Sequence, residues 1–280
     1  MKYIEIKAPA KINIGLFVVS KRADGYHNLR TLFYPISDLY DKLTFEPSNN
    51  FEFICNSAEL PIDKGNIVVQ AKELLERTSG KKLNVKITLE KKIPTQAGLG
   101  GGSSDAAATL ISLNEMFKLN LKHDQLIELA LQLGSDVPFF IRAKPAIGTS
   151  RGEILEEIPL EISEPILIVN PGIKISTKEA FGNIKPTGNN FDYKSIISGK
   201  ELIYNKMNNQ VINDFENYAF NKYQQLKQIK EQLKESGALF ALMSGSGSTM
   251  FGIFKDVRKA KEAVNKFPKD YYRWISIPGC

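Results

Sequence analysis

Polar and apolar residues alternate along much of the first hundred positions. The alternation covers residues 3–19, 41–47, 51–55 and 83–93. Successive side chains of a strand point to opposite faces, so this period of two predicts β-strands. One segment differs: from Asn66 to about residue 78 the apolar residues have helical spacing, with Asn66 as the expected cap and Gly80 as the stop.

Two further helices are predicted after a run of glycines. Residues 103–117 and 124–134 both carry apolar side chains at helical spacing. We expect the first helix to begin near Asp105, capped by Ser103 or Ser104, because serine is a preferred cap. Gly134 is expected to close the second helix in the left-handed conformation. These helices would cover the sheet.

Strand-like segments appear again beyond residue 155. A buried strand is predicted at 164–172, after a turn-prone stretch with Pro159 and Pro165. This places the expected domain boundary so that residues 1–155 and 156–280 form two domains. The remaining expectations are loop with short helices (178–210), helix (213–236), strand (238–243), turn (244–249), strand (250–254), helix (256–267) and strand (271–277). This order predicts an α+β fold, with helices on one face of an antiparallel sheet.

Composition narrows the class of protein. The 280 residues are 42% hydrophobic and carry a net charge of +6, and no stretch approaches the roughly 18 apolar residues of a spanning helix. Two cysteines, Cys55 and Cys280, form neither a disulfide framework nor a metal cluster, which favours the reducing cytoplasm. The lysines are spread along the chain, so the charge does not favour nucleic acid. We expect no membrane or nucleic-acid partner and predict no oligomeric state.

Residues 93–107 read IPTQAGLGGGSSDAA, between a predicted strand and a predicted helix. Glycines let backbone N–H groups approach an anion, and the helix N-terminus attracts it, so this context favours phosphate binding. The run is neither a Walker A loop, since no lysine follows Gly102, nor a dinucleotide fingerprint, since Ser103 stands in place of the third glycine. The alternative is a flexible connection, which four glycines in five positions make less favourable.

Four other features accompany this loop. Lys11 and Asn13 are two residues apart on one strand and therefore share a face. A turn at 24–27 carries a Tyr-His pair, Asp136 follows a helix end before Val-Pro, and 244–249 form a second glycine loop. With these residues the chain resembles the GHMP kinase superfamily. The resemblance runs through 9–18, 21–33, 65–71, 93–107, 133–140, 152–155, 170–177 and 244–249.

The resemblance implies a two-domain fold with a ribosomal-S5-domain-2-like N-terminal half, a ferredoxin-like C-terminal half and the site in the cleft between them. The stretch at 25–33 together with 135–140 is most similar to the superfamily's branch that phosphorylates the 2-hydroxyl of a cytidyl diphosphate ester of methylerythritol, in the non-mevalonate isoprenoid pathway.

The implied catalytic pair is Lys11 and Asp136. A carboxylate can take the proton of the alcohol as the O–P bond forms, and a nearby ammonium keeps it ionised. Without the resemblance, Asp136 reads as a helix cap and Lys11 as a solvated strand residue.

The resemblance also implies ligand contacts. ATP is expected on Asn66, Pro94, Thr95, Gln96, Ala97, Gly98, Leu99, Gly100, Gly101, Gly102, Ser103 and Ser104, with Mg²⁺ screening its phosphates and no certain protein ligand for the metal. The acceptor is expected on Asn13, Tyr26, His27, Phe33, Gly245 and Gly247. For Phe33, a core position is an equally good interpretation. For residues 244–249, the alternative is a plain hairpin turn. Ser135 and Ser248 stand where the family often has alanine and proline. These two differences bear on the detailed geometry of the site and not on its activity.

Three alternatives remain at this point. Another kinase of the superfamily, for homoserine or mevalonate, is disfavoured because neither acceptor has a base for Tyr26 and His27 to recognise. A non-catalytic nucleotide sensor needs the glycine loop but neither Lys11 nor Asp136. An RNA-binding module is suggested only by the net charge.

Overall fold

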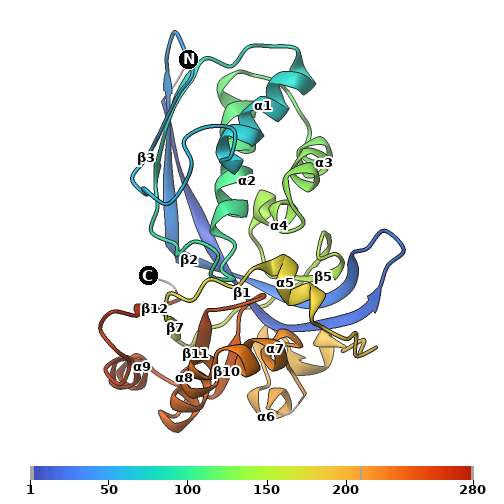
Figure 1. Cartoon of the computed structure of the whole chain (residues 1–280), viewed down its shortest axis with the longest axis vertical. Helices are drawn as coiled ribbons and strands as arrows, with labels where there is room; N and C mark the ends of the chain where they lie inside the picture. Colours follow the sequence, from blue (N-terminus) through green and yellow to red (C-terminus); the bar gives the residue numbers. More distant parts are fainter. Residues whose placement is uncertain (1–2, 209, 279–280) are drawn as a thin grey trace. The chain divides into compact units, whose positions relative to one another are not determined.

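The computed structural model describes residues 3–208 and 210–278. The chain forms two compact units whose segments alternate along the sequence (Figure 1). The first unit takes the described residues up to Ala10 together with Leu39–Thr95 and Gly100–Ala143. The second takes Lys11–Asp38, Gln96–Leu99 and the described residues from Lys144 onward. The predicted division at residue 155 stays a prediction, since these units are not continuous stretches of sequence.

The first unit is a sheet with helices along one face (Figure 1). The late residues of β2 pair antiparallel with β4, and β3 pairs parallel with β4. The strands are β3 (Glu52–Cys55), β4 (Val85–Glu90) and parts of β1 (Ile4–Lys21) and β2 (His27–Pro47), two paired strands that contribute residues to both units. The helices are α1 (Ile67–Ser79), α2 (Gly101–Met116), α3 (His123–Leu133) and α4 (Val137–Arg142).

The ends of these helices test the expected caps. Helix α1 is confirmed, since Asn66 accepts a hydrogen bond from Val68 N–H and Gly80 ends the helix in the left-handed region. The predicted start of α2 near Asp105 was wrong: the helix begins at Gly101, with Gly100 at the cap and no side-chain cap hydrogen bond. Gly134 does end α3, but its φ of 166° is extended rather than left-handed.

The second unit contains an antiparallel sheet, as the sequence predicted, and the structure shows its strand order to be β10-β11-β7-β12. Its strands are β7 (Ile166–Asn170), β10 (Phe240–Met243), β11 (Met250–Ile253) and β12 (Tyr272–Ser276). The early residues of β2 pair with β5 (Ala146–Ser150), which pairs with β6 (Ile154–Glu157). The connecting stretch holds short elements: α5 (Thr177–Gly182), the 3₁₀ turn η1 (Tyr193–Ile196), β8 (Ile197–Ser198), β9 (Glu201–Leu202) and α6 (Tyr204–Met207).

The single long helix expected at 213–236 is two helices. They are α7 (Phe215–Lys222) and α8 (Gln224–Glu235), which meet at Tyr223, whose φ of −135° and ψ of 82° are not helical. Helix α8 buries Leu226, Ile229 and Leu233, which recur on one face, as an amphipathic helix requires. They join the core of the unit together with α9 (Val257–Val264) and side chains of β7, β10 and β11. None of the described helices is long and apolar enough to cross a membrane.

Candidate functional site

Hydrogen bonds fix the backbone at the start of the glycine run. The carbonyl oxygens of three consecutive residues, 97–99, each accept a hydrogen bond from another part of the second unit. The donors, in that order, are Thr249 N–H at 3.2 Å, the Ser244 hydroxyl at 2.8 Å and Lys11 N–H at 2.9 Å. In a trans peptide the C=O and the following N–H point in opposite directions. The N–H groups of residues 98–100 are therefore directed away from these donors, as a backbone anion cradle requires.

The two glycine loops are in direct backbone contact. A Cβ atom on Gly98 would lie 2.1 Å from the Ser244 carbonyl oxygen, and one on Gly245 would lie 3.2 Å from Gly98 Cα. Both glycines have positive φ, +77° and +58°. Glycine is required here for backbone conformation and for space, because L-residues disfavour this region and no side chain fits between the loops. The second loop, which connects the paired strands β10 and β11, is thus also packed against the first.

Helix α2 follows the cradle directly in sequence. Gly100 is its cap, and the buried Ser104 lies in its first turn. The Ser104 hydroxyl has no hydrogen-bond partner among the described residues. The first N–H groups of a helix carry partial positive charge, so this end of α2 favours an anion.

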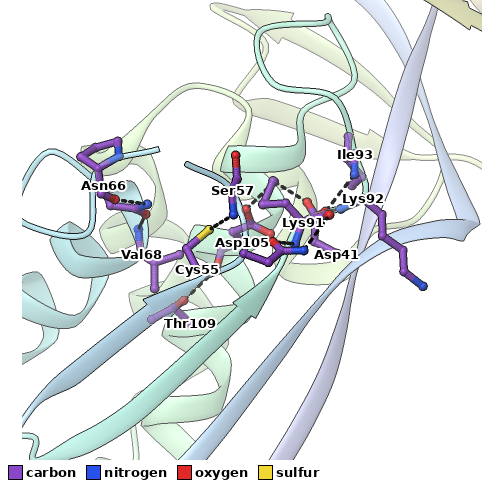
Figure 2. Close-up of polar contacts among 12 residues, drawn as sticks. Asp41, Cys55, Ser57, Asn66, Val68, Lys91, Lys92, Ile93, Asp105 and Thr109 are labelled. Atoms are coloured by element: carbon purple, nitrogen blue, oxygen red, sulfur yellow. Dashed lines mark hydrogen bonds and ion pairs between the residues drawn. The ribbon is translucent and has the colours of Figure 1, made fainter. Parts of the chain in front are cut away.

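A buried ion cluster joins the two ends of the glycine run in the first unit (Figure 2). The Lys91 ammonium donates to the carboxylates of both Asp41 and Asp105, the latter at 2.7 Å. The other Asp41 oxygen accepts the backbone N–H groups of Lys92 at 2.6 Å and Ile93 at 2.9 Å. Lys91 follows β4, Asp41 belongs to β2 and Asp105 to α2, so the cluster ties the strand before the loop to the helix after it.

Two carboxylates share this one ammonium. Burial raises the pKa of Asp105 well above its ordinary value, and the nearby Asp41 adds to the effect against the opposing charge of Lys91. Burial alone would lower the pKa of Lys91, but the Asp105 and Asp41 carboxylates raise it. Asp105 Oδ1 has no partner among the described residues, whereas both oxygens of Asp41 are hydrogen-bonded. Asp105 thus keeps its proton to a higher pH than an ordinary aspartate does.

Strand β1 carries the predicted pair Lys11 and Asn13. The Lys11 ammonium donates to Asn13 Oδ1, which confirms that the two side chains share a face, and both residues are buried. Asn13 also donates to the Thr31 hydroxyl at 2.8 Å, which fixes the orientation of its amide. The Lys11 ammonium lies 5.5 Å from the centre of the Phe33 ring. Phe33 is buried and packs against Gly148, so it is a core residue that also contacts Lys11.

The Tyr-His pair lies where the turn after β1 enters β2. The Tyr26 side chain is 53% exposed, and the Arg151 guanidinium lies 4.9 Å from the centre of its ring. The His27 imidazole is buried and stacks on the Phe181 ring, with centroids 5.2 Å apart and an interplanar angle of 21°. Burial, with help from Lys21, lowers the pKa of His27, so at neutral pH the ring is a neutral donor and acceptor. This arrangement presents aromatic faces beside a hydrogen-bonding edge.

Sequence reasoning missed Phe181. Its helix, α5, lies in the weakly periodic stretch that was read only as loop with short helices, and its aromatic character was the one available signal. The sequence could not indicate which ring it would meet.

The predicted residues Asn66 and Asp136 belong to the first unit. Asn66 uses its side chain for structure: Oδ1 accepts Val68 N–H and Nδ2 donates to the Pro61 carbonyl. Asp136 occupies the cap position of α4 but makes no side-chain cap hydrogen bond. The cap interpretation of Asp136 is therefore not supported by its contacts within this unit. Pro94, Thr95 and Gly100 to Ser104 also lie here, with the Thr95 hydroxyl 3.3 Å from Glu59.

Two buried asparagines hold the second glycine loop, and neither was predicted. The Asn213 amide donates to the carbonyls of Met243 and Gly245, both at 2.8 Å. The Asn170 amide donates to the hydroxyls of Ser248 at 3.1 Å and Thr249 at 2.9 Å. These hydrogen bonds hold the loop from two sides.

Comparisons with known proteins agree with this assembly of motifs. The model of the GHMP kinases N terminal domain matches residues 66–144, and that of the GHMP kinases C terminal matches residues 195–273. A 4-diphosphocytidyl-2-C-methyl-D-erythritol kinase of Chloroherpeton thalassium is 42% identical over 95% of this chain and 94% of its own. The chain belongs to the 4-diphosphocytidyl-2-C-methyl-D-erythritol kinase family.

Solved structures support the same assignment. A crystal structure of 4-(cytidine 5'-diphospho)-2C-methyl-D-erythritol kinase has a TM-score of 0.82 and 33% identity, covering 97% of this chain and 98% of its own. The two-domain α+β fold predicted from the sequence is confirmed by these family matches. The homoserine kinase of Cytophaga hutchinsonii has a TM-score of 0.76, covering 99% of this chain and 95% of its own, but only 17% identity. That likeness shows the fold alone.

Proposed function

We propose that this chain transfers the γ-phosphoryl group of ATP to the 2-hydroxyl of 4-diphosphocytidyl-2-C-methyl-D-erythritol. The observation that carries the proposal is the hydrogen-bonded joining of three motifs: the Lys11 strand, the cradle at 97–99 and the loop at 244–249. The family membership supports the same acceptor. This is a reaction of the non-mevalonate route to isoprenoid precursors.

Asp136 is proposed as the general base and Lys11 as the supporting positive charge. As the acceptor oxygen bonds to the γ-phosphorus, its proton passes to the Asp136 carboxylate and the bond to the ADP oxygen breaks. General-base catalysis contributes about 10²- to 10⁴-fold to the rate. The larger part of the barrier is lowered by alignment and by stabilising charge on the phosphoryl group. The N–H groups of the cradle and the N-terminus of α2 are suited to that task.

The acceptor is proposed to bind through its base and its diphosphate. Tyr26, His27 and Phe181 offer aromatic faces and a neutral imidazole edge, which fit a cytosine by stacking and hydrogen bonding. Asn13 is proposed to contact the methylerythritol hydroxyls, and the loop with Gly245 and Gly247 the diphosphate. Asn66 is proposed to lie near the adenine of ATP, where its buried side chain would shape the site through the α1 cap.

Mg²⁺ is proposed to accompany ATP. The described residues contain no group of three or more His, Cys, Asp or Glu side chains that could hold a metal. The buried Ser104 hydroxyl without a partner fits a single protein ligand, and the ATP phosphates would supply others. When bound, the ion would screen the phosphate charges that otherwise repel the acceptor. We further propose that the protein acts in the cytoplasm.

The test is an assay of ADP formation with three acceptors: the cytidyl compound, homoserine and mevalonate. We expect turnover with the first alone. The Asp136→Asn variant should lower kcat at least about a hundredfold, because an amide cannot take the proton, while the Kd for ATP stays within about twofold.

Asp124→Asn is the matched control, since Asp124 is an exposed aspartate in the first turn of a neighbouring helix. Its kcat should equal that of the unmodified enzyme. A decrease in kcat of less than about threefold in Asp136→Asn would show that Asp136 is not the general base.

A further inference from the structure

Ser244 is the point at which the three motifs meet. Its hydroxyl accepts Asn13 N–H at 3.2 Å from the lysine strand and donates to the Gly98 carbonyl at 2.8 Å in the first glycine loop. Its own backbone belongs to the second loop, where its N–H donates to the Thr249 carbonyl at 2.9 Å. The residue is fully buried, so water does not compete for the hydroxyl. One side chain thus uses both its donor and an acceptor position to connect segments that are distant in sequence.

The contact between the loops leaves little room for independent movement. The Ser244 carbonyl oxygen is one of the atoms that a Cβ on Gly98 would meet, at 2.1 Å. A second hydrogen bond, from Thr249 N–H to the Ala97 carbonyl at 3.2 Å, also joins the two loops. A displacement of either loop therefore stretches bonds made by the other. Packed backbone of this kind transmits a shift instead of absorbing it.

We infer that the Ser244 hydroxyl couples nucleotide binding to acceptor binding. This inference rests on the proposed function, in which the first loop binds ATP phosphates and the second binds the acceptor diphosphate. A ligand that orders one loop also fixes the position of the other, so the second ligand binds to a site that is already ordered. Linkage then requires that each ligand tightens the other by the same factor.

A role limited to filling the core predicts something different. Loss of the hydroxyl would then lower stability, and it would change the two affinities without changing the factor by which one ligand affects the other. The coupling factor is therefore the quantity that separates the two roles. Ser244 is in this sense a positioning residue, acting through the loops on ligands that it does not touch itself.

The experiment measures the Kd of a non-hydrolysable ATP analogue by calorimetry, with and without saturating 4-diphosphocytidyl-2-C-methyl-D-erythritol, and then the Kd of the acceptor with and without the analogue. In the unmodified enzyme we expect each ligand to tighten the other by about fivefold or more. In Ser244→Ala the factor should fall below about twofold.

Ser112→Ala is the matched control, because Ser112 is equally buried and its hydroxyl has no partner among the described residues. It should keep the full coupling factor. If Ser244→Ala does not fold, Ser244→Cys replaces it, since a thiol has similar size but is a weak donor.

Either of two results would overturn the inference: no coupling in the unmodified enzyme, or coupling that survives in the Ser244 variant. Failure of the unmodified enzyme to bind the analogue at all is a different result, which would refute the proposed function and with it this inference.

Discussion

Replacing Gly98 by alanine tests how the nucleotide loop is built. The residue has a φ of +77°, and the added Cβ would lie 2.1 Å from the Ser244 carbonyl oxygen and 3.1 Å from the Gly247 carbonyl oxygen. The left-handed backbone of an L-residue costs about 1–2 kcal/mol. Forcing atoms into a packed region costs about 1–3 kcal/mol more, because backbone must move. We therefore expect Gly98→Ala to lower the free energy of unfolding by about 2–5 kcal/mol.

Gly80→Ala separates the two contributions. Gly80 has a similar φ of +66°, but a Cβ placed there has no described atom within 4 Å. Only the backbone contribution of about 1–2 kcal/mol applies. Urea unfolding of both variants measures the difference, which should be at least about 1 kcal/mol.

Activity supplies the second half of the test. Where Gly98→Ala remains folded, its KM for ATP should rise at least about tenfold, because the cradle is displaced, and a tenfold change corresponds to only about 1.4 kcal/mol. Gly80→Ala should keep its KM. Equal losses of stability in the two variants would refute the contact between the loops, and an unchanged KM in Gly98→Ala would refute the role of this loop in binding ATP.

Two further predictions concern the buried ion cluster. Lys91→Met leaves two buried carboxylates without their ammonium and should lower the free energy of unfolding by about 3–5 kcal/mol. The control, Lys92→Met at the exposed neighbouring lysine, should change it by less than about 1 kcal/mol. Similar losses in urea unfolding of the two variants would contradict the role of Lys91 in stabilising the cluster. The second concerns pH: because the pKa of Asp105 is raised in the folded state, the native protein binds its proton more tightly, and stability falls as pH rises above about 4, by at most about 1.4 kcal/mol per pH unit. Asp105→Asn lacks this titration but can still accept from Lys91, so its stability relative to the unmodified enzyme should increase with pH. Parallel unfolding profiles between pH 4 and 8 would show that the pKa of Asp105 is not raised in the folded state.

Local signals in the sequence were reliable where local contacts decide the structure. Helix α1 has the predicted cap and stop because Asn66 bonds within its own first turn and Gly80 needs no partner elsewhere. Lys11 and Asn13 share a face because strand geometry alone requires it.

Prediction failed where distant contacts override local preference. Serine is a preferred cap, so α2 was expected to begin near Asp105, after Ser103 or Ser104. It begins at Gly101 instead, where a Cβ would lie 3.0 Å from Ile93 and 3.2 Å from the Lys91 ammonium. A Cβ at this helix start would therefore press on side chains at the end of the preceding strand, a contact that glycine avoids. The break at Tyr223 likewise lies within a pattern that continues smoothly in sequence.

The parts of the candidate site that were missed depend on pairs of distant residues. Phe181 stacks on His27, and Ser244 bonds to Gly98, which precedes it by 146 residues. Each residue alone is an ordinary aromatic or an ordinary serine. Their significance follows from the fold, which brings the pairs together, and a single sequence has no signal that names the partner.

The long separation between Gly98 and Ser244 has a consequence for synthesis on the ribosome. Translation at about 5–20 residues per second adds the intervening residues in about 7–30 seconds. During that time the carbonyls of Ala97 and Gly98 lack their native donors, since Thr249 and Ser244 have not been made. The glycine loop of the nascent chain therefore lacks these hydrogen bonds until most of the protein has been synthesised. The ability to bind a nucleotide is acquired late in translation.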